Sequence, residues 1–340
     1  MTNQLQMTKK INVAINGFGR IGRNLCRIIH NHPYINLVAI NDLANAKTLA
    51  HLLKYDSIHG VLPAAISSDF EYIFIDEKKI PVLSAPTPAQ CPWEKYDVDV
   101  VVEATGKFKS KSTLLQHLSA GAKKIILSAP PEDDQIKTVV IGVNENLITP
   151  EDRIISNASC TTNNAAPMIK IINELCGIEQ AYITTVHSYT TDQSLHDQPH
   201  NDLRRARAAG QSIVPTTTGA AKALTKIFPE FEQVIGGCGI RVPVPNGSLT
   251  DITFNVKKFI SAEEINRAFA HAANHELKGI VSYTEDPIVS IDIKGNTHSC
   301  IFDSLMTSVI GQMVKIIGWY DNEIGYSNRL VELIALICKN

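Results

Sequence analysis

Short apolar segments alternate with a helical pattern through the first half of the chain. Six segments are predicted strands: 11–16, 37–40, 98–102, 125–127, 139–141 and 154–155. After the first, Ile21, Leu25, Ile28 and Ile29 recur at the spacing of one helix face, and His32-Pro33 closes that helix. Strands this apolar are buried on both faces, as in a doubly wound parallel sheet with crossover helices.

The pattern changes after Cys160. A helix is expected there, ending at Gly177. Strands are predicted at 182–186, 252–256, 288–291 and 313–320, and helices at 220–227, 262–277 and 323–338. This order predicts an α+β domain with a mixed or antiparallel sheet. We therefore expect one domain of residues 1–159, rejoined by the C-terminal helix 323–340, and a second of residues 160–322.

Composition narrows the class of protein. The 340 residues are 44% hydrophobic and 19% charged, which argues against a disordered chain. The net charge of −2 is too small to attract nucleic acid or an anionic membrane through the overall electrostatic field. Seven cysteines without a C-x-x-C pair suggest neither a zinc site nor a disulfide framework. The polar segment 1–10 does not resemble a signal peptide. We expect a cytoplasmic protein without a metal site or membrane association.

A glycine motif follows the first predicted strand. Gly17, Gly19 and Gly22 form G-x-G-x-x-G, which lets a backbone approach a pyrophosphate at a helix N-terminus, although a tight strand–helix turn needs no ligand. Asp42 ends the next strand, 20 residues beyond Gly22, where a carboxylate binds ribose hydroxyls and repels a 2′-phosphate. Together these features predict a Rossmann-type domain that prefers NAD to NADP.

Cys160 and His187 are candidates for nucleophilic chemistry. Cys160 lies where a strand gives way to a helix, and the helix N-terminus stabilises a thiolate. His187 ends the strand 182–186, at a sheet edge. A buried thiol and a structural histidine remain the alternatives, since spacing does not show that the two side chains meet.

Five segments resemble the phosphorylating glyceraldehyde-3-phosphate dehydrogenases. They occur in family order, and the similarity extends from Ile11 to about Ile337. They are INGFGRIGR at 15–23, SNASCTTN at 156–163, TTVH at 184–187, PTTTGAAKA at 215–223 and WYDNE at 319–323.

The resemblance implies a mechanism and a cofactor site. The Cys160 thiolate attacks the aldehyde of glyceraldehyde 3-phosphate and His187 acts as the base. Hydride transfer to NAD then leaves a thioester, which inorganic phosphate cleaves to 1,3-bisphosphoglycerate. By the same comparison the cofactor contacts the backbone at Arg20 and Ile21, and also Thr105, Ser128 and Asn322.

The resemblance also implies two anion sites. Thr190, Asp192 and Arg241 match the site for the substrate phosphate, with Asp192 expected to orient Arg241. The site for inorganic phosphate is matched by Ser159, Thr161, Thr218 and Gly219. Helix capping is the alternative role for the threonines at 216–218.

The segment 204–207, with three arginines, has two interpretations. A nucleic-acid face would need more residues and interleaved aromatic side chains, so no nucleic-acid partner is expected. In the family this stretch lies in a loop at a subunit interface, and Pro199 in the same loop matches the NAD-preferring pattern. The resemblance therefore implies a homotetramer.

The sequence departs from the family at one position. Asn164 stands where the family typically has a second cysteine. This difference bears on the redox behaviour of the site and not on the activity, which needs only Cys160. Erythrose-4-phosphate dehydrogenase, on the same scaffold, remains an alternative, although the loop at Thr218-Gly219 is of the triosephosphate type. A non-catalytic nucleotide-binding regulator is a more distant alternative, which would be expected to lose Cys160 or His187.

Overall fold

The computed structural model describes residues 10–339, which divide into two compact units. Unit 1 holds residues 10–138, 147–157 and 327–339, and unit 2 holds Val139–Asn146 and Ala158–Tyr326. The expected domain boundary near residue 159 stays a prediction.

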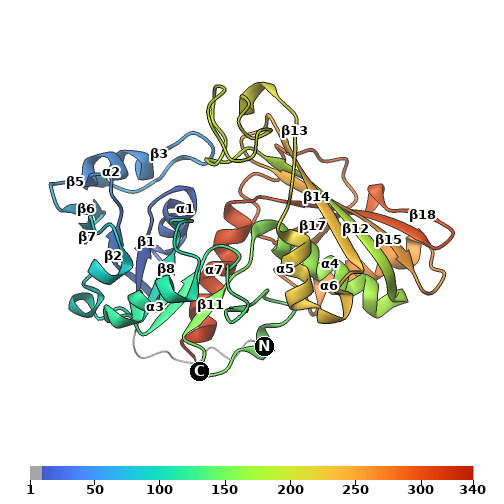
Figure 1. Ribbon diagram of the computed structural model, residues 1–340, viewed down its shortest axis with the longest axis horizontal. Helices are drawn as coiled ribbons and strands as arrows, with labels where there is room; N and C mark the ends of the chain where they lie inside the picture. The colour runs from blue at the N-terminus through green and yellow to red at the C-terminus, as the bar shows by residue number, and fades with distance from the viewer. Residues whose placement is uncertain (1–9, 340) are drawn as a thin grey trace. The chain divides into compact units, whose positions relative to one another are not determined.

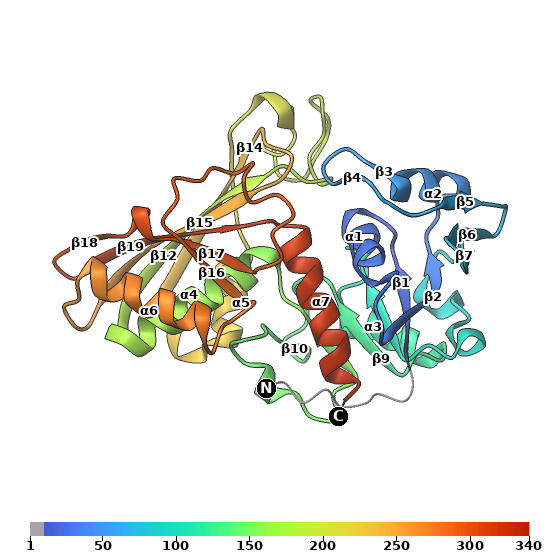
Figure 2. The same ribbon diagram turned by 180° about the vertical axis from the view of Figure 1, so that it is seen from behind.

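Unit 1 is built on a nine-stranded sheet (Figures 1 and 2). In spatial order its strands are β10 (Lys137–Thr138), β11 (Ile154–Ser156), β9 (Lys124–Leu127), β8 (Val100–Glu103), β1 (Ile11–Asn16), β2 (Ile35–Asn41), β7 (Lys78–Leu83), β6 (Tyr72–Ile75) and β5 (Ile66–Ser68). Pairing is parallel from β10 to β7 and antiparallel between β7, β6 and β5. Its helices are α1 (Arg20–Ile29), α2 (Ala46–Lys54) and α3 (Lys111–Ser119), and α2 leads into the hairpin of β3 (Tyr55–Asp56) and β4 (Gly60–Val61).

The order of the strands places a switch point beside β1. From β1 the chain passes through α1 to β2 on one side, and it later enters β8 on the other. In sheets of this kind, ligands bind at the carboxyl ends of the strands where the direction of winding reverses. Asn16, Asn41 and Glu103 end these three strands.

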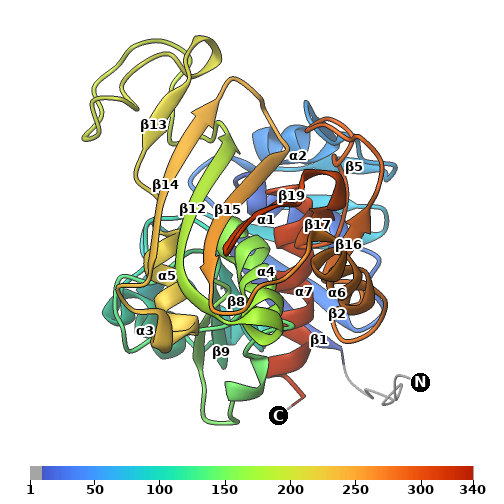
Figure 3. The same ribbon diagram turned by 90° about the vertical axis from the view of Figure 1, so that its right-hand side faces the viewer.

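Unit 2 contains a mixed eight-stranded sheet (Figure 3). In spatial order the strands are β13 (Val214–Thr216), β14 (Ile235–Val242), β12 (Ile178–Ser188), β15 (Ser248–Val256), β19 (Met313–Tyr320), β17 (Cys300–Asp303) and β16 (Val281–Thr284), with β18 (Ser308–Ile310) paired to β19. The helices α4 (Cys160–Cys176), α5 (Ala220–Ile227) and α6 (Ala262–Asn274) pack against this sheet. The predicted fold class is confirmed.

Shorter and terminal elements complete the description. The last helix, α7 (Ile324–Ile337), begins at the end of unit 2 and continues into unit 1. Single 3₁₀ turns occur at η1 (Pro88–Gln90), η2 (Trp93–Tyr96), η3 (Glu145–Leu147), η4 (Ala209–Gln211), η5 (Pro229–Phe231) and η6 (Ser304–Met306). Among the described residues, no helix combines the length and apolar character needed to cross a membrane.

Two predicted strands are wrong. Residues 139–141 form a turn closed by the Val143 and Asn144 amides on the Val140 carbonyl, and Val140 is buried in the core of unit 2. Residues 288–291 also turn, because the Val289 amide bonds to Asp292 and the Asp292 amide bonds back to Val289. Burial of Val140 explains the apolar character of the first segment, whereas Val289 and Ile291 in the second are exposed.

Candidate active site

Cys160 begins α4 after a strained turn. Ala158 is buried and has a left-handed φ of 54°, a conformation that costs free energy for a residue with a Cβ and is common at functional sites. Ser159 then caps the helix, accepting a hydrogen bond from the Thr162 amide at 3.1 Å. The turn and the cap present the Cys160 thiol at the helix N-terminus.

His187 lies next to this thiol. The distance from Cys160 Sγ to His187 Nε2 is 3.4 Å, so the structure brings the two candidates together within unit 2. His187 Nδ1 lies 2.7 Å from the Ser188 carbonyl oxygen, which can only accept a hydrogen bond, and 2.5 Å from Arg241 Nη1, which can only donate one, so the two contacts favour opposite tautomers. With the hydrogen on Nδ1, the Nε2 lone pair faces the thiol, as a base requires.

Arg241 supplies a positive charge beside the catalytic pair of Cys160 and His187. Its Nη1 donates to the Ser188 carbonyl at 3.0 Å and lies against the His187 ring. Burial, reinforced by the charge of Arg241, lowers the pKa of His187 to about 3. Burial raises the pKa of Cys160, while Arg241 acts in the opposite direction and favours the thiolate. The unliganded pair is therefore a neutral thiol and a neutral imidazole, and Arg241 reduces the cost of forming the thiolate.

The next residue of α4 joins the helix to β19. The Thr161 hydroxyl lies 2.9 Å from the Tyr320 hydroxyl, and both residues are buried. The Tyr320 ring stands edge-on to the His187 ring, with centroids 6.0 Å apart. Burial raises the pKa of Tyr320 well above its usual range, so this hydroxyl stays protonated. Tyr320 thus forms one wall of the catalytic pair, a role that was not predicted from its place in the segment 319–323.

The three glycines of the motif in unit 1 differ in the space around their Cα atoms. A Cβ on Gly17, whose φ is +95°, would lie 2.6 Å from the Thr105 amide nitrogen. A Cβ on Gly22 would lie 2.2 Å from the Gly17 carbonyl oxygen. Gly19 has nothing within 4 Å of its ideal Cβ position. The first and third glycines are therefore required by the fold, whereas the space above Gly19 is open for a ligand to approach the backbone.

Asp42 faces this loop. Its carboxylate accepts the Phe18 amide at 2.8 Å and the Ala44 amide at 3.0 Å, which fixes the orientation of both oxygens. The Arg20 side chain is held away by a two-pronged ion pair with Asp56 on the hairpin, and this pair lowers the pKa of Asp56. Arg20 and Ile21 are the first two residues of α1, and the contact of their backbone with the cofactor stays a prediction.

Two further predicted cofactor residues follow the neighbouring strands. Thr105 comes two residues after the end of β8, and Ser128 directly after β9. The Ser128 amide donates to the Glu103 carbonyl at 2.9 Å, and the Thr105 amide donates to the Glu103 carboxylate at 2.9 Å. Both residues are therefore fixed to the carboxyl end of β8.

The Asn322 side chain in unit 2 has a defined orientation. Its Oδ1 accepts hydrogen bonds from the Gly247 amide at 3.2 Å, the Ser188 hydroxyl at 3.0 Å and the Ser248 hydroxyl at 3.1 Å. Because a backbone amide can only donate, the oxygen is on this side and the amide NH₂ points the other way. Asn322 can therefore donate to a carbonyl group of a ligand.

The predicted phosphate residues divide into three groups. Arg241 joins the catalytic pair, as described above. Ser159 caps α4 and Thr161 lies in its first turn, while Thr218 and Gly219 directly precede α5, and the Thr218 hydroxyl accepts the Ala220 amide at 3.2 Å. Thr190 is half-buried just beyond β12, and its carbonyl accepts the Gln193 amide at 2.9 Å.

The expected pairing of Asp192 with Arg241 is wrong. Asp192 instead pairs with Arg205 at 2.6 Å and with His200 at 3.4 Å. Arg205 also donates to the Thr216 hydroxyl at 2.9 Å, so it ties its loop to β13. The reason is that His200 and Arg205, from the same loop as Asp192, occupy one carboxylate oxygen each.

Asn164 has a structural role at the position of the family's second cysteine. It is fully buried, and its amide donates to the Ser299 and Trp319 carbonyls, each at 3.2 Å. The side chain thus replaces a thiol with two hydrogen bonds that hold α4 to its neighbours in unit 2.

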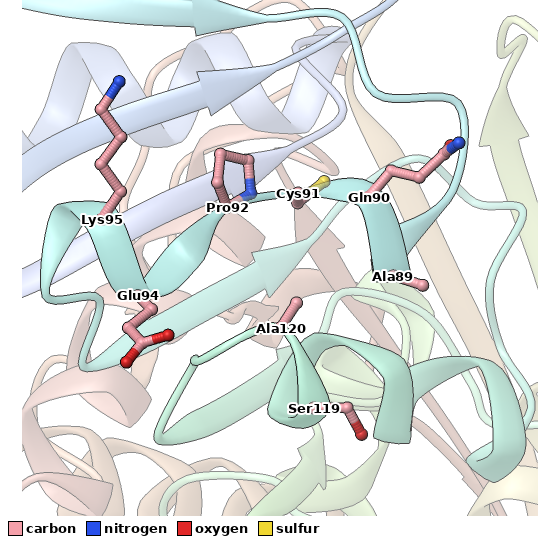
Figure 4. A pocket seen from close by; sticks show the side chains of 8 residues that line it. All are labelled: Ala89, Gln90, Cys91, Pro92, Glu94, Lys95, Ser119 and Ala120. Carbon is pink, nitrogen blue, oxygen red and sulfur yellow. The ribbon is translucent and has the colours of Figure 1, made fainter.

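One hollow within unit 1 lies away from the predicted site residues. It has a volume of about 570 Å³ and is lined by residues 89–92, 94, 95, 119 and 120, none of them a predicted site residue (Figure 4). These residues lead into the amino ends of β8 and β9, whereas the glycine loop lies at the carboxyl end of β1. Among the described residues, no group of three or more His, Cys, Asp or Glu side chains is arranged to hold a metal ion.

Comparisons with known proteins agree with this arrangement. Residues 11–111 match the family described as the glyceraldehyde 3-phosphate dehydrogenase NAD binding domain, and residues 159–322 match its C-terminal domain. Glyceraldehyde-3-phosphate dehydrogenase 1 of Bacillus cereus is 51% identical over 97% of this chain and 98% of its own length. The enzyme of Geobacillus stearothermophilus is 50% identical over 96% of this chain and 98% of its own length. The enzyme of Borreliella burgdorferi is 51% identical over 96% of this chain and 99% of its own length. The chain therefore belongs to the glyceraldehyde-3-phosphate dehydrogenase family.

Proposed function

We propose that this protein oxidises glyceraldehyde 3-phosphate to 1,3-bisphosphoglycerate, using NAD and inorganic phosphate. The observation that carries the proposal is the 3.4 Å contact between Cys160 Sγ and His187 Nε2 at the N-terminus of α4. A thiol, a base and a helix N-terminus together suit attack on an aldehyde and stabilisation of the resulting oxyanion.

NAD fits the residues present. Open backbone at Gly19 suits a pyrophosphate, and the fixed carboxylate of Asp42 suits a ribose diol and disfavours a 2′-phosphate. Thr105 and Ser128 would complete this side of the cofactor site, and the outward NH₂ of Asn322 suits the nicotinamide carboxamide. When bound, the cofactor supplies a hydride acceptor.

The chain's own residues carry the remaining chemistry. His187 Nε2 takes the thiol proton as Cys160 attacks the aldehyde carbon, and the Cys160 amide at the start of α4 stabilises the oxyanion. His187 returns this proton to the oxyanion, which gives the thiohemiacetal hydroxyl, and it takes the proton back in the oxidation of the thiohemiacetal to the thioester. Inorganic phosphate then attacks the thioester carbon, the carbon–sulfur bond breaks, and the acyl phosphate leaves Cys160 as a thiolate.

Two anion sites serve this sequence of steps. We assign the substrate phosphate to Arg241 and Thr190, with Asp192 acting at a distance through Arg205. We assign inorganic phosphate to the hydroxyls and amides of Ser159, Thr161, Thr218 and Gly219, which all belong to helix starts. A guanidinium is the better partner for a phosphate monoester, because it binds two oxygens at once.

We further propose a homotetramer located in the cytoplasm. The helices of unit 2 pack on one face of its sheet, and along β12 and β19 the side chains of Tyr182 and Met313 are 53% and 42% exposed. Val289 and Ile291 are exposed as well. Apolar exposure of this kind suits a subunit interface. The cofactor-binding domain would span residues 1–159 with the helix 323–340, and the catalytic domain residues 160–322.

The test follows NADH formation with purified protein. We expect rapid turnover that requires inorganic phosphate and prefers glyceraldehyde 3-phosphate to erythrose 4-phosphate in kcat/KM. Cys160→Ser serves as the blank. A preference for the tetrose phosphate with little dependence on phosphate would assign the protein to the sister activity, and turnover by Cys160→Ser would refute the mechanism.

A further inference from the structure

Glu103 is a buried carboxylate beneath the glycine loop. It ends β8, and its side chain is 0% exposed. Its Oε2 accepts hydrogen bonds from Asn16 Nδ2 and from His117 Nε2, the latter at 3.1 Å. Its Oε1 accepts the amide of Thr105 at 2.9 Å and the hydroxyl of the same residue. These partners lie at the end of β1, just beyond β8 and on α3.

Every one of these partners donates. The His117 tautomer is fixed because the Trp93 indole N–H donates to Nδ1 at 2.9 Å, so that the hydrogen of the neutral ring is on Nε2. A carboxylate offers about four acceptor positions, and four N–H and O–H groups occupy them. The surroundings therefore fit an ionised Glu103 and would leave a donor unpaired if its side chain were an amide.

This arrangement determines the polarity of the Thr105 hydroxyl. Its hydrogen is directed to Glu103 Oε1, and its oxygen accepts the Lys107 amide at 3.1 Å. The remaining lone pair can only accept a further hydrogen bond. Gly17 packs directly on the Thr105 amide, so this hydroxyl is held beside the glycine loop.

We propose that Glu103 is a positioning residue for the cofactor. It makes the Thr105 hydroxyl an acceptor, so that Thr105 binds a hydrogen-bond donor of the dinucleotide, a ribose hydroxyl or an amino group, and not a phosphate oxygen. The same carboxylate holds Asn16, whose Oδ1 accepts Asn41 Nδ2 at 2.7 Å, so it connects the ends of three adjacent strands. This inference rests on the proposed function only in taking NAD as the ligand.

The test is a double-mutant cycle on NAD binding, measured by calorimetry without substrate. Glu103→Gln places an NH₂ group among donors, and Thr105→Val removes the hydroxyl. Each single variant is expected to bind NAD about tenfold more weakly, since each loses a hydrogen bond in a buried setting. The double variant is expected to bind no more than about threefold more weakly than Glu103→Gln, because the two residues act as one unit.

Asp99→Asn is the matched control. Asp99 precedes β8, at the opposite end of the same strand pair, and accepts the Asn12 amide of β1 at 2.8 Å. The same chemical change there is expected to lower thermal stability while leaving the Kd for NAD within about twofold of wild type. If Glu103→Gln does not fold, Glu103→Asp replaces it, because the shorter side chain keeps the charge but withdraws from Thr105.

Each outcome has a defined meaning. Coupled losses confirm the positioning role. Additive losses, about a hundredfold in the double variant, or an unchanged Kd in the Glu103 variant would overturn it. Failure of the wild-type protein to bind NAD would instead refute the proposed function.

Discussion

At the residue scale, the proposed function depends on which polar groups can only donate a hydrogen bond and which can only accept one. The Ser188 carbonyl accepts from His187 Nδ1 in the tautomer that leaves Nε2 as a base, and the Gly247 amide sets the direction of the Asn322 amide. Neither contact can be derived from residue spacing, because the first depends on the local backbone conformation and the second joins residues far apart in the sequence. The resemblance did predict that Cys160 and His187 act together, and the structure places their Sγ and Nε2 atoms 3.4 Å apart, while their reactivity stays a prediction.

Arg241→Gln is expected to shift the reactivity of Cys160 to higher pH. The guanidinium lowers the pKa of the thiol, so its removal raises that pKa and reduces the thiolate population at any given pH below it. The alkylation rate of Cys160 with iodoacetamide, followed by mass spectrometry between pH 6 and 9, should fall several-fold at neutral pH. A profile that does not move, or that moves to lower pH, would contradict this electrostatic role.

His187→Asn is expected to lower kcat about 10²- to 10⁴-fold, because the proton of the thiol and of the thiohemiacetal loses its acceptor. The binding of NAD, measured by calorimetry, should remain within a few-fold of wild type. Unchanged turnover would show that another group is the base.

At the scale of elements, apolar patterning predicted eight of the nineteen strands and five of the seven α-helices among the described residues. Segments 139–141 and 288–291 have strand-like composition, yet one is buried as a turn in the core of unit 2 and the other turns at the surface. Patterning reports burial and propensity, and it does not distinguish a buried turn from a buried strand. Glu103 was missed for a related reason: the prediction ended its strand at Val102, although a charged residue ending so apolar a strand is a signal of a polar network.

The glycine loop gives a matched pair of variants. Gly22→Ala should lower the unfolding free energy by about 1–3 kcal/mol, because the added Cβ meets the Gly17 carbonyl. Gly19→Ala should unfold close to wild type, since its Cβ meets nothing within 4 Å, but should bind NAD at least tenfold more weakly if the backbone there contacts the pyrophosphate. Urea unfolding and calorimetry separate the two effects. Normal NAD binding by Gly19→Ala would place the pyrophosphate elsewhere.

We expect Asp42, which directly follows β2, to determine the choice between NAD and NADP. Asp42→Asn should weaken NAD binding and reduce the discrimination against NADP, each by about tenfold, because the variant no longer repels a 2′-phosphate. The ratio of the two dissociation constants is the quantity to measure. An unchanged ratio would mean that a group other than Asp42 distinguishes the 2′-hydroxyl of NAD from the 2′-phosphate of NADP.

At the scale of the whole molecule, the chain combines two units with separate tasks. Unit 1 carries the glycine loop, Asp42 and the Glu103 network, and unit 2 carries Cys160, His187 and Arg241. The run of strands and helices predicted two kinds of sheet, since a parallel sheet and a mixed sheet leave different patterns along the chain.

Assembly can be tested on the sheet of unit 2. Wild-type protein is expected to sediment as a particle of four chains, and Tyr182→Arg to give smaller species, because a charge on this exposed face would be buried without a partner. Phe70→Arg, on a 96% exposed residue of unit 1, is the control and should sediment as wild type. A wild-type monomer would contradict the proposed tetramer.

The central claim is that Cys160 carries the substrate as a thioester. The most direct measurement mixes the protein with NAD and glyceraldehyde 3-phosphate in the absence of phosphate and combines NADH absorbance with mass spectrometry of the Cys160 peptide. We predict a burst of about one NADH per site, an acyl group on Cys160, and steady turnover once inorganic phosphate is added. The absence of a burst, or an acyl group on a different cysteine, would contradict the account.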